Sequence, residues 1–372
     1  MKTVCKLNQC TGCMACIDIC PKQAIRIEDS LSSYNAVINE KLCVSCNLCH
    51  KVCQNNNEVE YLNPIDWKQG WRKDPELRAQ SSSGGAAASL MTAFAEKYGT
   101  VCSCVFQNGE FRFQFAENAE DISKFIGSKY VKSNPEGIYK QVRRKLANGQ
   151  PVLFVGLPCQ VEALKIFVGE KYQNKLYTVD LICHGSPSPK FLQMFLQEYG
   201  YSLESVEEIT FRKKAHFHLS KDYVGMEPES VTDTYTHAFL NCLDYTENCY
   251  DCKYARKERI SDLTIGDSWG SELPKEEQDK GISLILCQTE KGRELLMESD
   301  MELFPVDSER AIAYNRQLRH PSLPPIQREK FLKCFRKSIK FSLSVRKAYP
   351  KVFIKQAIKK LLIVAKIRGG NK

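Results

Sequence analysis

The run Cys10-Thr-Gly-Cys-Met-Ala-Cys-Ile-Asp-Ile-Cys20 has the spacing C-x2-C-x2-C-x3-C, and the same spacing returns in Cys43-Val-Ser-Cys-Asn-Leu-Cys-His-Lys-Val-Cys53. Three thiolates on one tight loop can bind three corners of a cubane, and the fourth cysteine of such a run ligates the other cluster. The spacing therefore predicts two [4Fe–4S] clusters with crossed ligand sets. One set is Cys10, Cys13, Cys16 and Cys53, and the other is Cys43, Cys46, Cys49 and Cys20.

A zinc ribbon or knuckle is the alternative interpretation of this segment. Such a site uses four ligands in two pairs, whereas this segment holds eight cysteines in two identical runs. Gln54 stands where the pattern usually has proline after the second run, which affects the turn and leaves the ligands intact. Cys5 lies outside the pattern, and we expect it to be a small apolar filler.

The composition is that of a globular protein with many thiols. The chain has 372 residues, of which 26% are charged and 43% are hydrophobic, and it contains 18 cysteines. A disulfide scaffold is disfavoured because the chain is long, lacks a secretory leader and carries its cysteines in tight triplets. We find no stretch of 18 apolar residues and expect no transmembrane helix. These features predict a cytoplasmic protein in a reducing compartment, with an anaerobic host because exposed clusters are sensitive to oxygen.

We expect an α+β ferredoxin-like module, a linker, an α/β core and a helical, basic C-terminal region. These parts are placed at residues 1–60, 61–80, 81–300 and 301–372. The linker is assigned because its residues are polar and include Pro64 and Pro75.

The α/β core is inferred from helix-like and strand-like segments that alternate along the chain. Helices are expected from the small residues after Ser81 to about Lys97 and at 138–147. Strands are expected at 24–28 and 36–39 in the module and at 101–106, 111–115, 151–155 and 176–182 in the core. In open α/β sheets, the loops at the carboxyl ends of strands carry function.

A second group of cysteines occupies such loops. Cys159 and Cys183 each follow an expected strand, and Cys249-Tyr-Asp-Cys252 forms a two-ligand clip. A lone cysteine after a strand is most often buried packing, so structural packing stays open beside a third cluster, and Cys242 is a competing ligand. The remaining cysteines are interpreted as structural, namely Cys102, Cys104, Cys287 and Cys334.

Two glycine-containing segments, Ser83-Gly-Gly85 and Gly127-Ser-Lys-Tyr130, have the composition of anion-binding turns. Glycine at the start of a helix exposes backbone N–H groups at the positive end of the helix dipole. Lys129 or the basic run 212–214 would add charge for a pyrophosphate, although turn glycines and a solvated charge run are the simpler alternative. The absence of G-x-G-x-x-G and Walker motifs disfavours a Rossmann site.

Several motifs follow one another in a recognisable order. They are Ser-Gly-Gly (83–85), Gly-Ser-Lys-Tyr (127–130), Phe-Val-Gly-Leu-Pro-Cys-Gln (154–160), Asp-Leu-Ile-Cys-His-Gly (180–185), Phe-Arg-Lys-Lys (211–214), Cys-Tyr-Asp-Cys-Lys-Tyr-Ala (249–255) and Asp-Leu-Thr-Ile-Gly-Asp-Ser-Trp-Gly (262–270). This order resembles the family of coenzyme F-420 hydrogenase/dehydrogenase beta subunits, fused to a ferredoxin module. The resemblance covers roughly residues 1–295.

The resemblance implies an FAD in the α/β core and a third [4Fe–4S] cluster beside it. The third cluster would use Cys159, Cys183, Cys249 and Cys252. The FAD contacts would come from three loops, at Ser83, Gly84, Gly85, Gly127, Ser128, Lys129, Tyr130, Gly156, Pro158 and Gln160.

We therefore expect an iron–sulfur flavoprotein oxidoreductase that takes electrons from ferredoxin or another redox protein and reduces a small organic acceptor. The resemblance also admits surface-polysaccharide metabolism as its setting, a deazaflavin coenzyme as its substrate, or a non-catalytic electron-transfer subunit of a larger hydrogenase or dehydrogenase. A redox sensor is disfavoured because no output domain is recognisable. No catalytic residue is assigned: His184 is interpreted as structural before it is interpreted as a proton donor, and Asp267 as part of a turn.

The net charge of +9 comes from the C-terminal region. From Arg328 to Lys372 there are fifteen Lys or Arg residues and a single acid, Glu329. This region is expected to be a helix on an anionic bilayer, or equally a helix that docks on an acidic partner or is only solvated; nucleic acid is disfavoured because no binding fold accompanies the charge. The apolar side of the helix is expected to hold Val352, Phe353, Ile358, Leu361, Leu362 and Val364.

Overall fold

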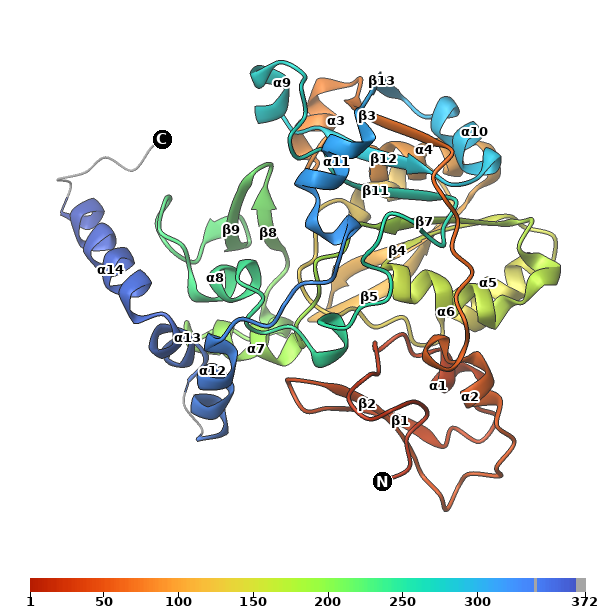
Figure 1. Ribbon diagram of the computed structural model, residues 1–372, viewed down its shortest axis with the longest axis horizontal. Coiled ribbons are helices and arrows are strands. Elements are labelled where there is room, and N and C mark those ends of the chain that lie inside the picture. The colour runs from red at the N-terminus through yellow and green to blue at the C-terminus, as the bar shows by residue number, and fades with distance from the viewer. Residues whose placement is uncertain (338–339, 366–372) are drawn as a thin grey trace.

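The computed structural model describes residues 1–337 and 340–365 and is organised around one large mixed sheet (Figure 1). Its eight strands are ordered β13-β3-β12-β11-β7-β6-β4-β5. The central strands β4, β6, β7 and β11 are parallel, whereas β5, β12, β3 and β13 join the two edges in antiparallel pairs. The expected α/β core is thus a mixed α/β sheet with a parallel centre.

The strands of the three sheets have the following bounds. The large sheet contains β3 (Asp66–Arg72), β4 (Thr100–Gln107), β5 (Glu110–Ala116), β6 (Val152–Gly156), β7 (Leu176–Leu181), β11 (Leu263–Asp267), β12 (Ser283–Cys287) and β13 (Met301–Pro305). The smaller sheets contain β1 (Ile25–Asp29) with β2 (Tyr34–Ile38), and β8 (Ile209–Lys213) with β9 (His216–Lys221) and β10 (Val224–Gly225).

The helices lie between and after these strands. They are α1 (Ala15–Ile19), α2 (Leu48–Val52), α3 (Pro75–Gln80), α4 (Ala86–Tyr98), α5 (Ile138–Ala147), α6 (Pro158–Val168), α7 (Pro189–Gln197), α8 (Thr234–Leu240), α9 (Lys275–Asp279), α10 (Glu290–Glu298), α11 (Ser308–Tyr314), α12 (Gln327–Arg336), α13 (Phe341–Ala348) and α14 (Pro350–Val364).

The continuous apolar sequence of β6 follows from cover on both faces of the sheet. Val152 and Phe154 pack with side chains of α5 and α6, whereas Leu153 and Val155 pack with side chains of α4 and α10. Successive side chains of a strand point to opposite faces, so every position of a strand covered on both sides must be apolar. This explains why the expected strands at 151–155 and 176–182 are present within one or two residues.

The N-terminal module (residues 1–60) packs against α5 and α6, below the large sheet in Figure 1. Its cysteines and the side chains of α5 and α6 belong to one apolar core. The buried carboxylate of Asp18 accepts hydrogen bonds from the backbone N–H groups of Gly137 (2.7 Å) and Tyr139 (3.1 Å). Because Gly137 begins α5 without a side-chain cap, Asp18 satisfies the N-terminus of that helix from the other module.

Two segments differ from the expected organisation. Residues 61–80, expected to be a linker, form β3 and α3, and β3 lies inside the large sheet between β12 and β13. Residues 301–305, expected to begin a helical region, form β13 beside β3. The sequence pattern did not indicate β3 because its first three residues are half-exposed and largely polar. The two strands also pair with segments that lie far from them in the sequence.

The C-terminal helices α12 and α13 pack with α7 and α8 through an aromatic cluster that includes Phe191, Phe331 and Phe341. The apolar residues of helix α14, which were expected to lie on one side of the helix, differ in their burial. Val352 and Phe353 pack on the protein, Leu362 is half-buried, and an outer stripe of Ile354, Ile358, Leu361 and Val364 is exposed. The last residues of the basic region, 366–372, lie outside the described residues. Within the described ranges, no helix combines the length and the hydrophobicity needed to cross a membrane.

Candidate functional site

The first predicted ligand set is gathered in the interior. Cys10, Cys13, Cys16 and Cys53 line a common cavity, and each is less than a tenth exposed. Burial raises the pKa of Cys13, and burial together with Cys13 and Cys49 raises the pKa of Cys16. We call these four thiols the inner set.

Cys5 joins the inner set in space, although it lies outside the sequence pattern. It lines the same cavity, and hydrogen bonds from the Cys10 and Cys53 thiols lower its pKa to about 3. The interpretation of Cys5 as an apolar filler is therefore incomplete, because its sulfur faces the other thiols. Cys5 lies five residues before the first run, and no sequence pattern indicates that it joins the inner set.

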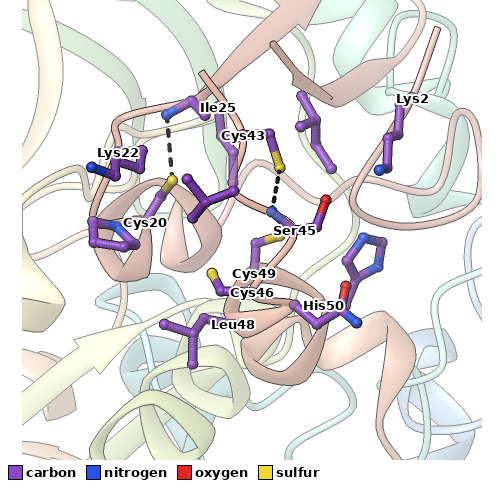
Figure 2. A pocket seen from close by; sticks show the side chains of 15 residues that line it. Lys2, Cys20, Lys22, Ile25, Cys43, Ser45, Cys46, Leu48, Cys49 and His50 are labelled. Carbon is purple, nitrogen blue, oxygen red and sulfur yellow. Dashed lines mark hydrogen bonds between the residues drawn. The ribbon is translucent and has the colours of Figure 1, made fainter. Parts of the chain in front are cut away.

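The second predicted set lies at the surface. Cys20, Cys43, Cys46 and Cys49 line one cavity, and Figure 2 shows their sulfur atoms directed toward a shared space. Cys46 is exposed and the other three are half-exposed. We call these four thiols the outer set.

The exchange of the fourth cysteine between the sets follows from the repeated backbone of the two runs. Each run reaches a left-handed residue, Met14 (φ 61°) or Asn47 (φ 59°), and then forms one short helix, α1 or α2. The fourth cysteine ends that helix in an extended conformation. Helices α1 and α2 pack together, so each fourth cysteine is placed in the cavity of the other run. The structure groups the thiols as the spacing predicts, and their ligation of clusters stays a prediction.

A third group of thiols lies between the inner set and the large sheet. Burial raises the pKa of Cys183 to about 12, and the neighbouring Cys249 and Cys252 add to the rise. Burial also raises the pKa of Cys159, with further contributions from Cys252 and Cys183. Cys159 begins α6 after β6, and Cys183 follows β7. The four cysteines expected for a third cluster thus lie near one another, and we call them the core group.

The competing cysteine occupies a different environment. Cys242 is buried against Phe239 and Tyr245, and its sulfur accepts from Arg316 Nη2 at 3.7 Å. Within the described residues, no group of three or more His, Cys, Asp or Glu side chains is arranged as a site for a single metal ion.

Tyr254 and Gln54 connect the inner set with the core group. Burial raises the pKa of Tyr254, and the nearby Cys159, Cys252 and Cys13 raise it further, so this ring has thiols of both groups around it. Its hydroxyl donates to Gln54 Oε1, and Gln54 Nε2 donates to Thr11 Oγ1 at 3.3 Å. Gln54, a departure from the usual proline, therefore supplies a side chain that joins the two modules.

Lys132 places a buried positive charge at the same junction. It is 6% exposed, and its ammonium donates to the Thr11 carbonyl at 3.0 Å. It lies over the Tyr34 ring, 5.2 Å from the centroid, and it acts to lower the pKa of Cys159 and Cys183. Sequence reasoning missed this lysine because nothing in its neighbourhood along the chain marks it.

A cavity of about 320 Å³ lies at the carboxyl ends of the central strands. Its wall includes all three loops expected to contact a cofactor, and also Cys183 of the core group. The expected residues that line it are Ser83, Gly85, Gly127, Ser128, Lys129, Tyr130, Gly156 and Gln160. Gly84 and Pro158 do not line it, because Gly84 packs so closely on β3 that an added Cβ would lie 2.4 Å from the Gly70 oxygen, while Pro158 is buried in the first turn of α6.

The cavity wall combines open backbone with aromatic and apolar side chains. A Cβ added to Gly127 would meet nothing within 4 Å, and α4 begins at the wall without a side-chain cap. Sequence reasoning missed the aromatic part of the wall, where Tyr130 stacks on Phe239 with centroids 4.3 Å apart. It also assigned Cys104, which lines the cavity, to a structural role. Other lining residues that were not expected are Phe217, Tyr245 and Trp269.

An ion pair fixes the loops around the cavity. Arg212 donates to both carboxylate oxygens of Asp267, at 2.7 and 2.8 Å, and to the Ser82 carbonyl at 2.8 Å. Burial opposes the charge of Arg212, but the Asp267 carboxylate outweighs burial, so the pKa of Arg212 is raised. Lys214 donates to the Ser83 carbonyl at 3.0 Å. Both basic residues therefore hold the 81–85 loop by its carbonyl groups.

The environments of Lys129 and His184 bear on the roles considered for them, which were binding of a pyrophosphate and donation of a proton. The Lys129 ammonium donates to the carbonyls of Phe125 (2.7 Å) and Ile126 (3.2 Å), which directs it away from an anion in the cavity. His184 faces the cavity, where burial and the charge of Arg316 lower its pKa to about 4. An imidazole with this pKa is neutral at pH 7.

Two family models match parts of this chain. Residues 9–57 match the 4Fe-4S dicluster domain. Residues 149–305 match the family described as the C terminus of the beta subunit of coenzyme F420 hydrogenase/dehydrogenase.

Individual relatives are distant, and the chain spans about half the length of the curated relatives it matches. It is 26% identical over 188 residues to the F subunit of the F(420)H(2) dehydrogenase of Methanosarcina mazei, covering 47% of this chain and 53% of the relative. It is 24% identical over 322 residues to the coenzyme F420-dependent sulfite reductase of Methanocaldococcus jannaschii, covering 78% and 47%. It is 24% identical over 220 residues to an uncharacterized protein of Nostoc sp., covering 55% and 50%.

Among solved structures, a chain of the F420-reducing [NiFe] hydrogenase complex from Methanosarcina barkeri is similar, with 21% identity and a TM-score of 0.46. The similarity covers 70% of this chain and 94% of that chain. The family matches, together with the ordered motifs and the thiol sets, confirm the resemblance: residues 149–305 are similar to the C terminus of the coenzyme F420 hydrogenase/dehydrogenase beta subunit, and residues 9–57 are similar to the 4Fe-4S dicluster domain.

Proposed function

We propose that this protein is an iron–sulfur flavoprotein oxidoreductase that exchanges electrons with a redox protein and with a small organic acceptor. One observation carries this proposal. Cys183 belongs both to the core group and to the wall of the cavity, and the core group in turn adjoins the inner set through Tyr254. The thiol groups therefore form a row from the surface to the cavity.

The donor sets fit iron–sulfur clusters. Each of the three groups offers four thiols at the predicted positions, and thiolates are the ligands of [4Fe–4S] clusters. Cys5 also lines the cavity of the inner set, and His50 lines that of the outer set. Cys249 has a Thr246 hydroxyl 3.6 Å from its sulfur, and hydrogen bonds of this kind tune a cluster. We assign the clusters to the inner set, the outer set and the core group.

The lining of the cavity fits a flavin. Ala87 and Ala88 in the first turn of α4 line the cavity, and Gly85 begins this helix without a side-chain cap, an arrangement that suits a phosphate. The aromatic and apolar wall at Phe217, Phe239 and Trp269 suits a planar ring system. Bound clusters would supply one-electron transfers, and a bound flavin would supply the change to two-electron chemistry.

The residues of the chain would position the acceptor and exclude water. The Arg212–Asp267 pair holds the 81–85 loop over the cavity, and Ser128 N–H donates to Ser82 Oγ at 2.9 Å, which joins two of the loops. Neutral His184 faces the cavity, so it would offer one N–H donor and one acceptor at pH 7. We assign no catalytic residue.

The test is anaerobic purification followed by iron, sulfide and flavin analysis. We expect about twelve iron atoms per chain and about one flavin released by acid. Serine substitution of Cys249 should remove about four iron atoms, with Cys242→Ser as the matched control that removes none. Eight iron atoms in the unmodified chain, or no released flavin, would refute the third cluster or the flavin respectively.

A non-catalytic electron-transfer subunit is the second candidate, because one similar protein is the F subunit of a dehydrogenase and the chain spans about half of that protein. Native mass measurement and an acceptor screen separate the two candidates. The screen includes an oxidised deazaflavin and nucleotide sugars of surface-polysaccharide pathways. A chain that is stable only with a catalytic partner and reduces no acceptor alone would establish the non-catalytic role.

We also propose that the outer stripe of α14 makes a peripheral contact with an anionic surface. Ile354, Ile358 and Leu361 are more than half exposed, and exposed Lys351 and Lys355 lie beside them on the same helix. This arrangement is typical of helices that lie on anionic bilayers. Sedimentation with anionic liposomes should fall when Ile358 and Leu361 are replaced by Asp; unchanged sedimentation would overturn the proposal, and binding only to an acidic protein would assign the stripe to a partner.

A further inference from the structure

The outer set is surrounded by exposed apolar side chains. Leu42 is 51% exposed, Val44 57% and Leu48 39%, and Val44 and Leu48 line the cavity that holds the four thiols. Apolar side chains of this size are usually buried. Their gathering around the exposed thiol Cys46 marks a contact surface rather than an ordinary loop.

Positive charges lie beside this apolar centre. Lys2 and Lys22 line the cavity and lie on opposite sides of it in Figure 2. Lys41 and Lys51 are exposed and adjoin Leu42 and His50 in the sequence. Among the described residues, no Asp or Glu lines the cavity, and Glu40 is the single acid between Ile38 and Val52. We call the three apolar residues and these four lysines the outer face.

The lysines of the outer face have no ion-pair partner within the described residues. By contrast, exposed basic residues on the far side of the large sheet are paired, as Lys97 is with Glu298 and Lys275 with Asp279. The positive charge of the outer face is therefore left uncompensated within the fold, and it is available to a partner.

We propose that the outer face is the docking site of an acidic one-electron carrier protein, such as a small ferredoxin of net negative charge. The proposal rests on the oxidoreductase function above, because it assigns a cluster to the outer set. An apolar centre beside charges of one sign gives a small, transient interface with steered association, which is the kind used by electron-transfer proteins. The inner set, by contrast, is less than a tenth exposed and so is closed to such a partner.

Each docking event would transfer one electron. The reduced carrier loses one electron, the cluster of the outer set gains it, and no proton or other group is exchanged. Two such events supply the two electrons that a two-electron acceptor takes up, with protons from water.

The test compares two triple charge reversals in the anaerobic holoprotein. The first variant carries Lys22→Glu, Lys41→Glu and Lys51→Glu on the outer face. The matched control carries Lys97→Glu, Lys275→Glu and Arg293→Glu on α4, α9 and α10 at the far side of the large sheet, and it changes the net charge by the same amount. Iron content confirms that each variant holds its clusters. Stopped-flow absorbance then measures cluster reduction by an acidic 2[4Fe–4S] ferredoxin and, separately, by reduced methyl viologen.

We expect the first variant to lower the second-order rate constant with ferredoxin by about 10- to 100-fold at low ionic strength, and the control by less than about twofold. The difference should shrink at high salt because surface charges are screened. Reduction by methyl viologen should not be slowed in either variant, since a small cationic reductant needs no docking face and is not repelled by the added acids.

Three outcomes would overturn the docking site. They are equal slowing by both variants, a rate constant with ferredoxin that does not depend on salt, or inhibition of wild-type reduction by an equimolar RNA oligonucleotide, which would assign the positive face to nucleic acid. A wild-type protein whose clusters methyl viologen does not reduce would instead contradict the proposed function, so the two failures are distinguishable.

Discussion

The two runs of the N-terminal module share one spacing but occupy opposite environments. The inner set is buried in the core shared with α5 and α6, whereas the outer set holds the exposed Cys46. Equivalent positions of the repeat differ in the same way: Ala15 is fully buried and its counterpart Leu48 is 39% exposed. The spacing of cysteines thus fixes which thiols meet, and the residues between them decide whether a set faces the protein or a partner.

One pair of equivalent residues accounts for much of this difference. Asp18 stands two residues after Cys16 and accepts two backbone hydrogen bonds at the start of α5. Lys51 stands two residues after Cys49 and is exposed. A buried carboxylate that completes a helix terminus attaches one half of the module to the core, and an exposed cation leaves the other half open.

The largest expected effect comes from removing one thiol of each set. Cys16→Ser and Cys49→Ser should each lose about four iron atoms, but only Cys16→Ser should also lower the free energy of unfolding by about 3 kcal/mol, because its set lies in the shared core. Iron analysis and anaerobic denaturation measure both quantities. Equal losses in the two variants would show that the burial of the inner set does not contribute to the free energy of unfolding.

Controlled exposure to air should separate the two clusters by rate. The cluster of the outer set should decay at least about tenfold faster than that of the inner set, because oxidation of thiolate sites follows their exposure. Time-resolved electron paramagnetic resonance of the dithionite-reduced protein follows each signal, and the two serine variants assign the signals. Decay at one common rate would contradict the contrast between the sets.

Truncating the equivalent residues Asp18 and Lys51 should give unequal losses of stability. Asp18→Ala leaves the Gly137 and Tyr139 N–H groups without their acceptor, so we expect a loss of about 1–3 kcal/mol. Lys51→Ala removes an exposed side chain and should change stability by less than about 0.5 kcal/mol. Denaturant titration of the anaerobic holoproteins measures the difference in the free energy of unfolding. A loss in Lys51→Ala as large as in Asp18→Ala would contradict the role of Asp18 in attaching the module to the core.

The smallest expected effect concerns cluster potentials. Lys132→Met removes a buried positive charge beside the core group, and it should lower the midpoint potential of that cluster by roughly 60 mV, which is a tenfold change for one electron. Lys2→Met removes an exposed charge beside the outer set, where water screens it, so its shift should be less than half as large. Redox titration followed by electron paramagnetic resonance measures both, and a larger shift in Lys2→Met would reverse this ranking.

The parts of the site that depend on local sequence could be predicted. The crossed thiol sets follow from a repeated run, and β6 and β7 follow from short apolar segments whose next loops carry Cys159 and Cys183. The resemblance to the family predicted that three loops contribute to one site, and all three line the cavity. Of the ten residues predicted from these loops, Gly84 and Pro158 do not line it.

The parts that depend on distant packing could not be predicted. Cys5, Lys132 and Gln54 acquire their positions from contacts across the two modules, as when Lys132 reaches the carbonyl of Thr11. Strand β3 was mistaken for part of a linker because a strand inside a sheet is recognised by its pairing partners as much as by its own residues. Flavin binding, the third cluster and the other domain boundaries stay predictions.

The position of β3 also has a consequence for how the protein is made. Gly70 pairs with Ser283 on one side and with Leu303 on the other, so β3 leaves the ribosome long before either neighbour exists. Formation of a sheet from such distant partners is slow. An unpaired strand is prone to aggregation until its partner strands have been synthesised. The cysteine runs precede β3 in the sequence, so all eight of their thiols leave the ribosome before the large sheet can close.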